Sequence, residues 1–142
     1  MIERRLFQCH VVGRPAPQGS KTPTKYGGFR ESSKYLKPWR DAVVLAAVSA
    51  KANEYDFDPF DGPVRLSVTF FIERPKTTKW KRYPAGTPDL SKLLRGVEDA
   101  LTTANVWVDD ALVVEANVRK VWAGVDTGSF PSPGCRIAVE PL

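Results

Sequence analysis

Apolar residues recur along this chain with two different periods, and these periods mark the secondary structure that the sequence predicts. Residues 64–72 alternate cleanly, so that every second side chain from Val64 to Ile72 falls on one apolar face, which is typical of a half-buried strand. Shorter apolar runs between turn-rich segments predict three further strands, at residues 6–12, 112–122 and 135–139.

Two other segments repeat their apolar residues at helical spacing. Residues 39–52 are rich in alanine and carry an apolar stripe that begins at Trp39, and Pro38 suits the first turn of a helix. Residues 89–102 place leucines and Val97 on one side and charged or hydroxyl side chains on the other. Both segments are therefore predicted to be helices that cover an apolar surface.

The resulting order is β-α-β-α-β-β, which predicts an α/β (α+β) fold with a single mixed sheet of about four strands and two main helices. We expect each β-α-β unit to form a parallel crossover, and the last two strands to form a hairpin with a long loop. The length of 142 residues suits one domain, and no repeat, low-complexity segment or linker divides the chain. Residues 1–142 are therefore predicted to form a single domain.

The amino-acid composition indicates the general class of this protein. Charged residues make up 26% and hydrophobic residues 42% of the chain, values typical of a soluble globular protein. The basic start, residues 1–12, is too polar for a signal peptide, and no stretch approaches the roughly 20 apolar residues of a membrane span, so we expect a cytoplasmic protein without a membrane partner. Cys9 and Cys135 lie in predicted strands, far apart in sequence, and are interpreted as buried thiols rather than a zinc site.

A net charge of +5 favours a polyanionic partner, and the distribution of the charge favours DNA. Two basic loops, residues 14–37 and 74–82, hold 11 of the 21 lysines and arginines, and such loops suit a surface that holds the phosphates around a branch point. The residues expected to contact DNA are Arg14, Lys21, Lys25, Arg30, Lys76, Lys79, Lys81, Arg82 and Lys92. Aromatic rings such as Trp80 and Tyr35 interleave with these charges; they either stack on unpaired bases or anchor the loops, and for any one ring anchoring is the favoured interpretation.

Against this basic background, three aspartates stand out as candidate metal ligands. Asp89 opens the second helix, and Asp109 and Asp110 open the third strand, a layout that we expect to bring them to one end of the helix–strand unit. Magnesium binds hard oxygen ligands, usually one or two carboxylates together with waters and phosphate oxygens, and it activates a water for phosphodiester hydrolysis. Arg95 and Lys92, on the helix between the aspartates, are candidate cations for the phosphate charge.

Each aspartate also has a simpler explanation. Asp89 follows a proline, and that position alone favours a helix N-cap. Asp109 and Asp110 are equally explained as a turn before the strand; on a regular strand neighbouring side chains point to opposite faces, so one of the two should face the site more directly. Glu98 and Asp99 are interpreted as solvated helix charges. The combination of the three aspartates within one short stretch of a basic chain favours the metal site.

The same stretch resembles the RusA family of Holliday-junction resolvases, which are common in phages and prophages. The family pattern is roughly P-D-x-D-N-x-x-K on a helix, followed by D-A-L and by a D-D pair before a strand. It is matched here by PDLSKLLR at residues 88–95, DAL at 99–101 and VWVDDALVV at 106–114. A proline-rich, lysine-containing loop after the first strand, GRPAPQGSKTPTK at 13–25, also matches.

The resemblance implies a small homodimeric endonuclease that requires Mg²⁺, with Mn²⁺ as a substitute and no small-molecule cofactor. The implied substrate is four-way or other branched DNA, resolved by paired symmetric nicks in recombination and repair. For a phage-encoded protein, the compartment is the cytoplasm of the bacterial host. Carried over by position, the metal ligands are Asp89, Asp110 and Asp109, and these three with Arg95 form the catalytic set.

Two positions depart from the family pattern. Ser91 stands where the family has a second acid, and Arg95 replaces the family lysine. Serine is a poor magnesium ligand, and arginine keeps the charge but cannot donate a proton as a lysine can. The alternative function is therefore a non-catalytic module that binds branched DNA and derives from a resolvase. A nuclease that prefers RNA or flap substrates is a further alternative.

Overall fold

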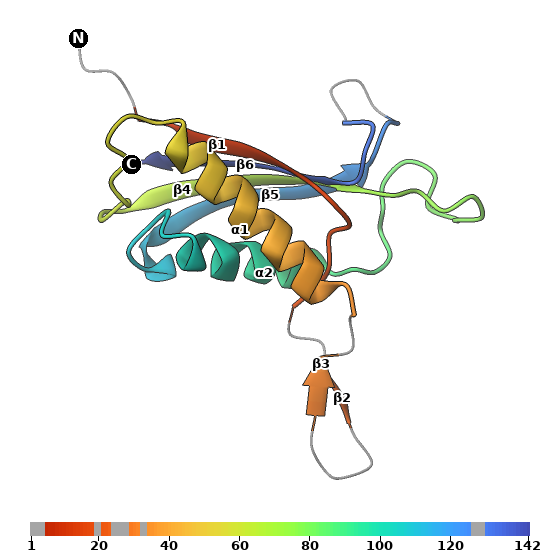
Figure 1. Cartoon of the computed structure of the whole chain (residues 1–142). Coiled ribbons are helices and arrows are strands. Elements are labelled where there is room, and N and C mark those ends of the chain that lie inside the picture. The colour runs from red at the N-terminus through yellow and green to blue at the C-terminus, as the bar shows by residue number, and fades with distance from the viewer. Residues whose placement is uncertain (1–4, 19–20, 24–28, 32–33, 126–129) are drawn as a thin grey trace.

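The computed structural model describes residues 5–18, 21–23, 29–31, 34–125 and 130–142, and for 21–23 and 29–31 only the course of the backbone. Its elements, in chain order, are β1 (Phe7–Val12), β2 (Lys21–Pro23), β3 (Phe29–Glu31), α1 (Leu36–Ala52), β4 (Val64–Ile72), α2 (Leu90–Thr103), the 3-10 turn η1 (Asp110–Leu112), β5 (Val113–Trp122) and β6 (Gly134–Pro141). Figure 1 shows a sheet with α1 and α2 on one of its faces, and a short hairpin of β2 and β3 that projects away from both layers.

The predicted fold class is confirmed. A four-stranded mixed sheet with the strand order β1-β6-β4-β5 is covered by two helices, and the main elements follow the order β-α-β-α-β-β. β4 and β5 are parallel, so that β4–α2–β5 forms the expected crossover. β1 and β4 also run in the same direction, but β6 lies between them and is antiparallel to both.

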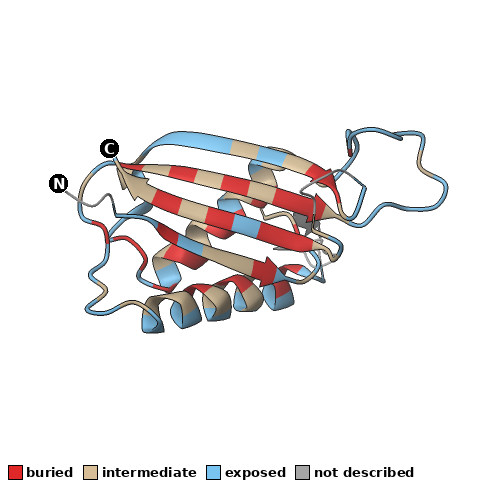
Figure 2. Ribbon diagram, turned by 90° about the horizontal axis from the view of Figure 1, so that it is seen from above, coloured by how far each residue is buried: buried red, intermediate tan, exposed pale blue. Residues whose placement is uncertain are grey.

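The predicted hairpin between the last two strands is wrong, because β6 does not pair with β5. β6 instead lies in the centre of the sheet, between β1 and β4, whereas β5 forms an edge. Cys135, Ile137 and Val139 of β6 are fully buried, while residues 114–117 of β5 are exposed, and Figure 2 shows buried positions concentrated on the central strands. A central position buries this apolar face and satisfies the backbone groups on both sides of β6.

A second difference from the prediction is the β2–β3 hairpin. It lies within the segment that the sequence marks as a loop, and it is a short antiparallel pairing in which Lys21 is opposite Glu31. Strands of three residues are too short to leave a periodic signal in the sequence.

The apolar stripe predicted for the second helix is confirmed and holds the crossover on the sheet. Leu93, Val97 and Leu101 of α2 are fully buried, whereas Ser91 and Arg95 on its other side are exposed. Burying a side chain of this size contributes about 1.5–3 kcal/mol. The stripe, rather than helix propensity, therefore fixes α2 in place. No helix among the described residues has both the length and the apolar character needed to cross a membrane.

Both cysteines are free, and their surroundings confirm the interpretation of buried thiols. Cys135 is fully buried, and Cys9 is half-buried and packs against the core. Burial raises the pKa of the Cys9 thiol to about 11 and raises the pKa of Cys135 well above its ordinary value. Both side chains therefore stay protonated and unreactive near neutral pH.

Gly134, where β6 begins, provides a test of the close approach between β6 and β1. A Cβ atom added to Gly134 would lie 1.9 Å from the carbonyl oxygen of Val11 on β1. We expect Gly134→Ala to lower the free energy of unfolding by at least about 2 kcal/mol, measured by urea denaturation, because the two strands must separate to admit the methyl group. Gly62→Ala is the matched control, since nothing lies within 4 Å of its added Cβ. Equal stability of the two variants would contradict the pairing of β1 with β6.

Candidate functional site

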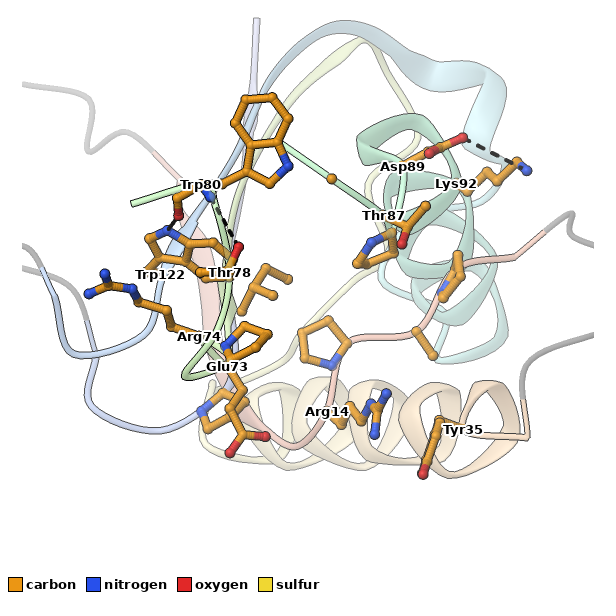
Figure 3. A pocket seen from close by; sticks show the side chains of 18 of the residues that line it. Arg14, Tyr35, Glu73, Arg74, Thr78, Trp80, Thr87, Asp89, Lys92 and Trp122 are labelled. Atoms are coloured by element: carbon orange, nitrogen blue, oxygen red, sulfur yellow. Dashed lines mark hydrogen bonds and ion pairs between the residues drawn. The ribbon is translucent and has the colours of Figure 1, made fainter. Parts of the chain in front are cut away.

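Asp89 occupies the N-cap position of α2 but does not cap the helix with its side chain. Its backbone is extended, with φ −68° and ψ 136°, and its carboxylate makes no capping hydrogen bond. The carboxylate is exposed and lies 3.8 Å from Nζ of Lys92 (Figure 3). The side chain of Asp89 therefore gives no support to the capping explanation, and it is accessible to a ligand.

A lysine that the sequence reasoning missed fixes the loop that leads into Asp89. Nζ of Lys120, on β5, donates hydrogen bonds to the carbonyl oxygens of Gly86 (2.6 Å) and Pro88 (2.8 Å). Burial lowers the pKa of Lys120, and the negative charge of Asp89 opposes that change. In the sequence, Lys120 interrupts the apolar alternation at the end of β5, and a charge at an inward position is the signal that could have identified it.

The start of α2 forms one wall of a cleft of about 850 Å³. The other walls come from the segment after β1, the start of α1 and the basic loop after β4 (Figure 3). The charged residues at the cleft are Arg14, Glu73, Arg74, Lys76, Asp89 and Lys92. The aromatic residues at the cleft are Tyr35, Trp80 and Trp122. The cleft thus combines an excess of positive charge with aromatic surface.

Contacts between side chains and loops shape two walls of this cleft. Nε1 of Trp122 donates a hydrogen bond to the carbonyl oxygen of Trp80 (2.9 Å), which ties the basic loop to the end of β5. On another wall, the guanidinium carbon of Arg14 lies 3.8 Å from the centre of the Tyr35 ring, within the range of a cation–π interaction. Trp122 is nearly buried and has an anchoring role, whereas Trp80 keeps 42% of its surface exposed.

The Asp109–Asp110 pair begins the turn η1, directly before β5. Oδ1 of Asp109 accepts a hydrogen bond from the backbone N–H of Ala111 (2.8 Å), so Asp109 has the turn-forming role that the sequence left open. Asp110 is exposed, but reduced hydration of its carboxyl group raises its pKa. A hydrogen bond with Asp109 and the charges of Asp109 and Asp99 raise that pKa further, while the charge of Arg95 opposes the change.

Glu98 and Asp99 are not the solvated charges that the sequence suggests. Both are half-buried, and Asp99 accepts a hydrogen bond from the side-chain amide of Gln18. Burial raises the pKa of Glu98, the charges of Asp110 and Asp99 raise it further, and Arg95 lowers it. These residues form one electrostatic unit, which we call the acidic group: Glu98, Asp99, Asp109 and Asp110, with Arg95 beside them.

The structure does not bring Asp89 together with Asp109 and Asp110. Asp89 directly precedes α2, whereas the acidic group involves the C-terminal half of that helix, and η1 lies near the opposite end of α2 (Figure 1). Asp99 lies ten positions after Asp89, which corresponds to about 15 Å along a helix. The reason is the parallel crossover: a helix that starts at the C-terminal end of one strand must return the chain to the N-terminal end of the next.

The acidic group fits a hard divalent cation in one binding mode only. Among the residues that the structure describes, no three histidine, cysteine, aspartate or glutamate side chains are grouped so that they could hold a metal ion. Magnesium is often bound by one or two carboxylates together with waters and the phosphate oxygens of a substrate. Asp109 and Asp110 fit that mode, whereas a single ion shared between Asp110 and Asp89 does not fit this arrangement.

The residues expected to contact DNA fall into three sets. Three of them lie at the cleft: Arg14, Lys76 and Lys92. Three more are exposed on the loop after β4: Lys79, Lys81 and Arg82. The others lie outside the part of the chain whose side chains are described: Lys21, Lys25 and Arg30. Lys25 is outside the described residues altogether. For all nine, contact with DNA stays a prediction.

Comparison with known proteins connects this arrangement to one family. A curated relative, the crossover junction endodeoxyribonuclease rusA of Lactococcus phage r1t, is 32% identical over 59 residues, which are 42% of this chain and 45% of the relative. That alignment spans less than half of the relative's length. The sequence model of the family described as Endodeoxyribonuclease RusA matches residues 13–128, a span that includes both basic loops, α2 and the Asp109–Asp110 pair. Since this match covers well over half of the chain, the protein belongs to the RusA endodeoxyribonuclease family.

Proposed function

We propose that this protein is a Mg²⁺-dependent endodeoxyribonuclease that cuts branched DNA, with four-way junctions as its substrate. The observation that carries the proposal is family membership over residues 13–128, a span that contains the basic loops and the acidic group together. The phage relative is named as a crossover junction endodeoxyribonuclease, which supports a junction as the class of substrate.

The charge distribution supports a nucleic-acid substrate. The chain carries a net charge of +5, and four basic side chains surround the cleft at the start of α2. Neutralising phosphates with lysine and arginine releases counterions from DNA and supplies most of the non-specific affinity. The side chain of Asp89 makes no capping hydrogen bond to the N-terminal N–H groups of α2, so the partial positive charge of these groups also favours a phosphate there.

The acidic group supports hydrolytic chemistry. Mutual repulsion contributes to the raised pKa values of Asp110 and Glu98, and a cation would relieve that repulsion. Asp109 and Asp110 would hold Mg²⁺ or Mn²⁺; when bound, the ion supplies a Lewis acid at the phosphate and an activated water. Arg95 places a positive charge beside these carboxylates and offsets negative charge that develops on the phosphate. Asp89 acts apart from this metal site, because its carboxylate lies at the cleft next to Lys92.

Paired cuts require two active sites. Two symmetric nicks across a four-way junction match the symmetry of a two-fold dimer, in which each subunit presents one acidic group to one strand. We therefore propose that the active form is a homodimer and that the nicks fall at equivalent positions on opposing strands. Mapping of the two nicks on end-labelled junctions tests this part of the proposal.

The rival function is a non-catalytic module that binds branched DNA, because Ser91 replaces the second acid of the family pattern. Ser91 lies in the first turn of α2, beside Asp89 and not beside Asp110. The substitution therefore leaves the Asp109–Asp110 pair intact. This position of Ser91 favours a nuclease that retains its hydrolytic carboxylates over a module that has lost them.

The variant Asp110→Asn separates the nuclease from the binding module. For the nuclease, we expect junction cleavage with Mg²⁺ to fall by about 100-fold or more, because loss of an outer-shell partner of a metal ligand already costs about 10- to 100-fold. Junction affinity should be kept or increased, because a negative charge near DNA is removed. Asp41→Asn removes the same charge from the exposed face of α1 and should leave cleavage unchanged. A folded wild-type protein that binds junctions but cuts none, with Mg²⁺ or Mn²⁺, would establish the binding module instead.

The separation of Asp89 from Asp110 predicts unequal effects on metal binding. We expect Asp110→Asn to weaken Mn²⁺ binding by about tenfold or more, measured by isothermal titration calorimetry without DNA. Asp89→Asn should leave that affinity nearly unchanged, since α2 holds Asp89 away from the acidic group. Equal losses in the two variants would mean that both aspartates share an ion, which contradicts the arrangement described above.

The basic loop after β4 predicts a defined salt dependence of DNA binding. We expect the double variant Lys76→Gln/Lys79→Gln to weaken binding to junctions and to duplex DNA alike, because phosphates are common to both. The slope of log affinity against log salt concentration should fall by about 0.9 for each lost phosphate contact. Arg119→Gln is a control that removes one positive charge from an exposed position on β5, and it should leave the slope unchanged. An unchanged slope in the double variant would exclude the loop from the DNA-binding surface.

A further inference from the structure

The cleft at the start of α2 contains an aromatic side chain that the hydrolytic proposal does not use. The chain has four tryptophans, and Trp39, Trp107 and Trp122 are 2%, 1% and 5% exposed. Trp80 is 42% exposed and lines the cleft (Figure 3). Water-exposed indole surface in a cleft has no packing role in the folded chain, and it is the kind of surface that ligands stack on.

The backbone that carries Trp80 is held from both sides. Its N–H donates a hydrogen bond to Oγ1 of Thr78 (3.1 Å), and its carbonyl oxygen accepts one from Nε1 of Trp122 (2.9 Å). Gly86 lies against the edge of the indole ring, where an added Cβ would be 3.5 Å from Nε1 of Trp80. The loop that carries Gly86 is itself braced by Lys120. These contacts restrain the loop that carries the ring, so less conformational entropy is lost when a base stacks on the indole, which we call the platform.

One cation lies beside this platform, and others line the same cleft. Nζ of Lys79 lies 5.0 Å from the centre of the Trp80 ring, and Lys76 and Lys92 line the same cleft. On another wall, Arg14 is held over the ring of Tyr35 (Figure 3). A cleft that contains one exposed aromatic ring and several cations complements a nucleotide, because the base offers a flat face and the backbone offers negative charge.

We infer that this cleft holds an unpaired nucleotide of the DNA substrate, with its base stacked on Trp80 and its phosphates near Lys92 and Arg14. The volume of about 850 Å³ lies within the range of small-ligand sites, about 300–1,000 Å³. A base inside a duplex has both faces covered by its neighbours, so only an unstacked base can present a face to the indole. This inference rests on the DNA-binding part of the proposed function and does not depend on cleavage.

The test compares Trp80→Ala with wild type in binding to a short oligothymidylate and to a fully paired duplex, with EDTA present so that no cutting occurs. We expect the affinity for oligothymidylate to fall by about 5- to 100-fold, the range measured for loss of one stacking contact, and the affinity for duplex to stay unchanged. Trp80→Phe should retain most of the affinity for oligothymidylate. Tyr55→Ala, which removes a ring that is 95% exposed and does not line the cleft, should bind both DNAs as wild type does.

Trp80 also reports on the site directly, because it is the tryptophan with a large exposed surface. Oligothymidylate should quench the fluorescence of the wild-type protein, and the quenching should be absent in Trp80→Phe. The inference is overturned if Trp80→Ala binds oligothymidylate as wild type does, or if it loses both DNAs in parallel. Cleavage of junctions by the wild type is measured separately, so failure of the nuclease proposal and failure of this inference give different results.

Discussion

The parallel pairing of β4 with β5 is the constraint on which the rest of this structure depends. Parallel neighbours cannot be joined by a tight turn, so the chain must cross the sheet, and α2 makes that crossing while it buries Leu93, Val97 and Leu101. The crossover fixes the start of α2 at the C-terminal ends of the strands, where the cleft lies, and returns the chain to the N-terminal end of β5, where Asp109 and Asp110 lie. Ligand sites in α/β sheets commonly lie at the C-terminal ends of strands, as this cleft does.

Charged side chains lie at both ends of α2 and along its C-terminal half. A helix is stabilised by acidic residues near its start and basic residues near its end. In α2, Asp89 supplies a carboxylate at the N-cap, and Nζ of Lys51 on α1 donates a hydrogen bond to the carbonyl oxygen of the C-cap residue Ala104 (2.7 Å). Glu98 and Asp99 lie in its C-terminal half, where burial and the charges of Asp110 and Asp99 raise the pKa of Glu98. A cation held by the carboxylates beside this half of the helix would relieve the repulsion among them.

Local patterns in the sequence predict the elements of this fold well, and they predict the partners of those elements poorly. The alternation in residues 64–72 and the leucine stripe of residues 89–102 reappear as β4 and α2 because each depends on side chains close together in the chain. The central place of β6 depends on β1 and β4, more than sixty residues away, and no local pattern carries that information. The expected meeting of Asp89 with Asp110 fails for a reason already present in the predicted order, since a parallel crossover separates those two positions. The role of Lys120 as a brace and the partial burial of Glu98 and Asp99 depend on tertiary packing, which a single sequence does not reveal.

The distance between the two ends of α2 bears on how such a protein would select branched DNA. A helix of 14 residues is about 21 Å long, and successive nucleotides of one strand are spaced by about 3.4 Å along duplex DNA, so the two ends are about six nucleotides apart. If the cleft holds an unpaired nucleotide while the acidic group acts on a phosphate, the DNA must present an unpaired base and a phosphate about six nucleotides apart, or on neighbouring arms of a junction. A continuous duplex offers the phosphate without the unpaired base, and a single strand offers the base without a rigid second arm. Neither base stacking nor phosphate binding is specific alone, because stacking contributes about 1–3 kcal/mol for any base and every DNA strand carries the same phosphates. Selection of a branch point would then follow from simultaneous engagement of two weak sites, whose spacing is set by one helix.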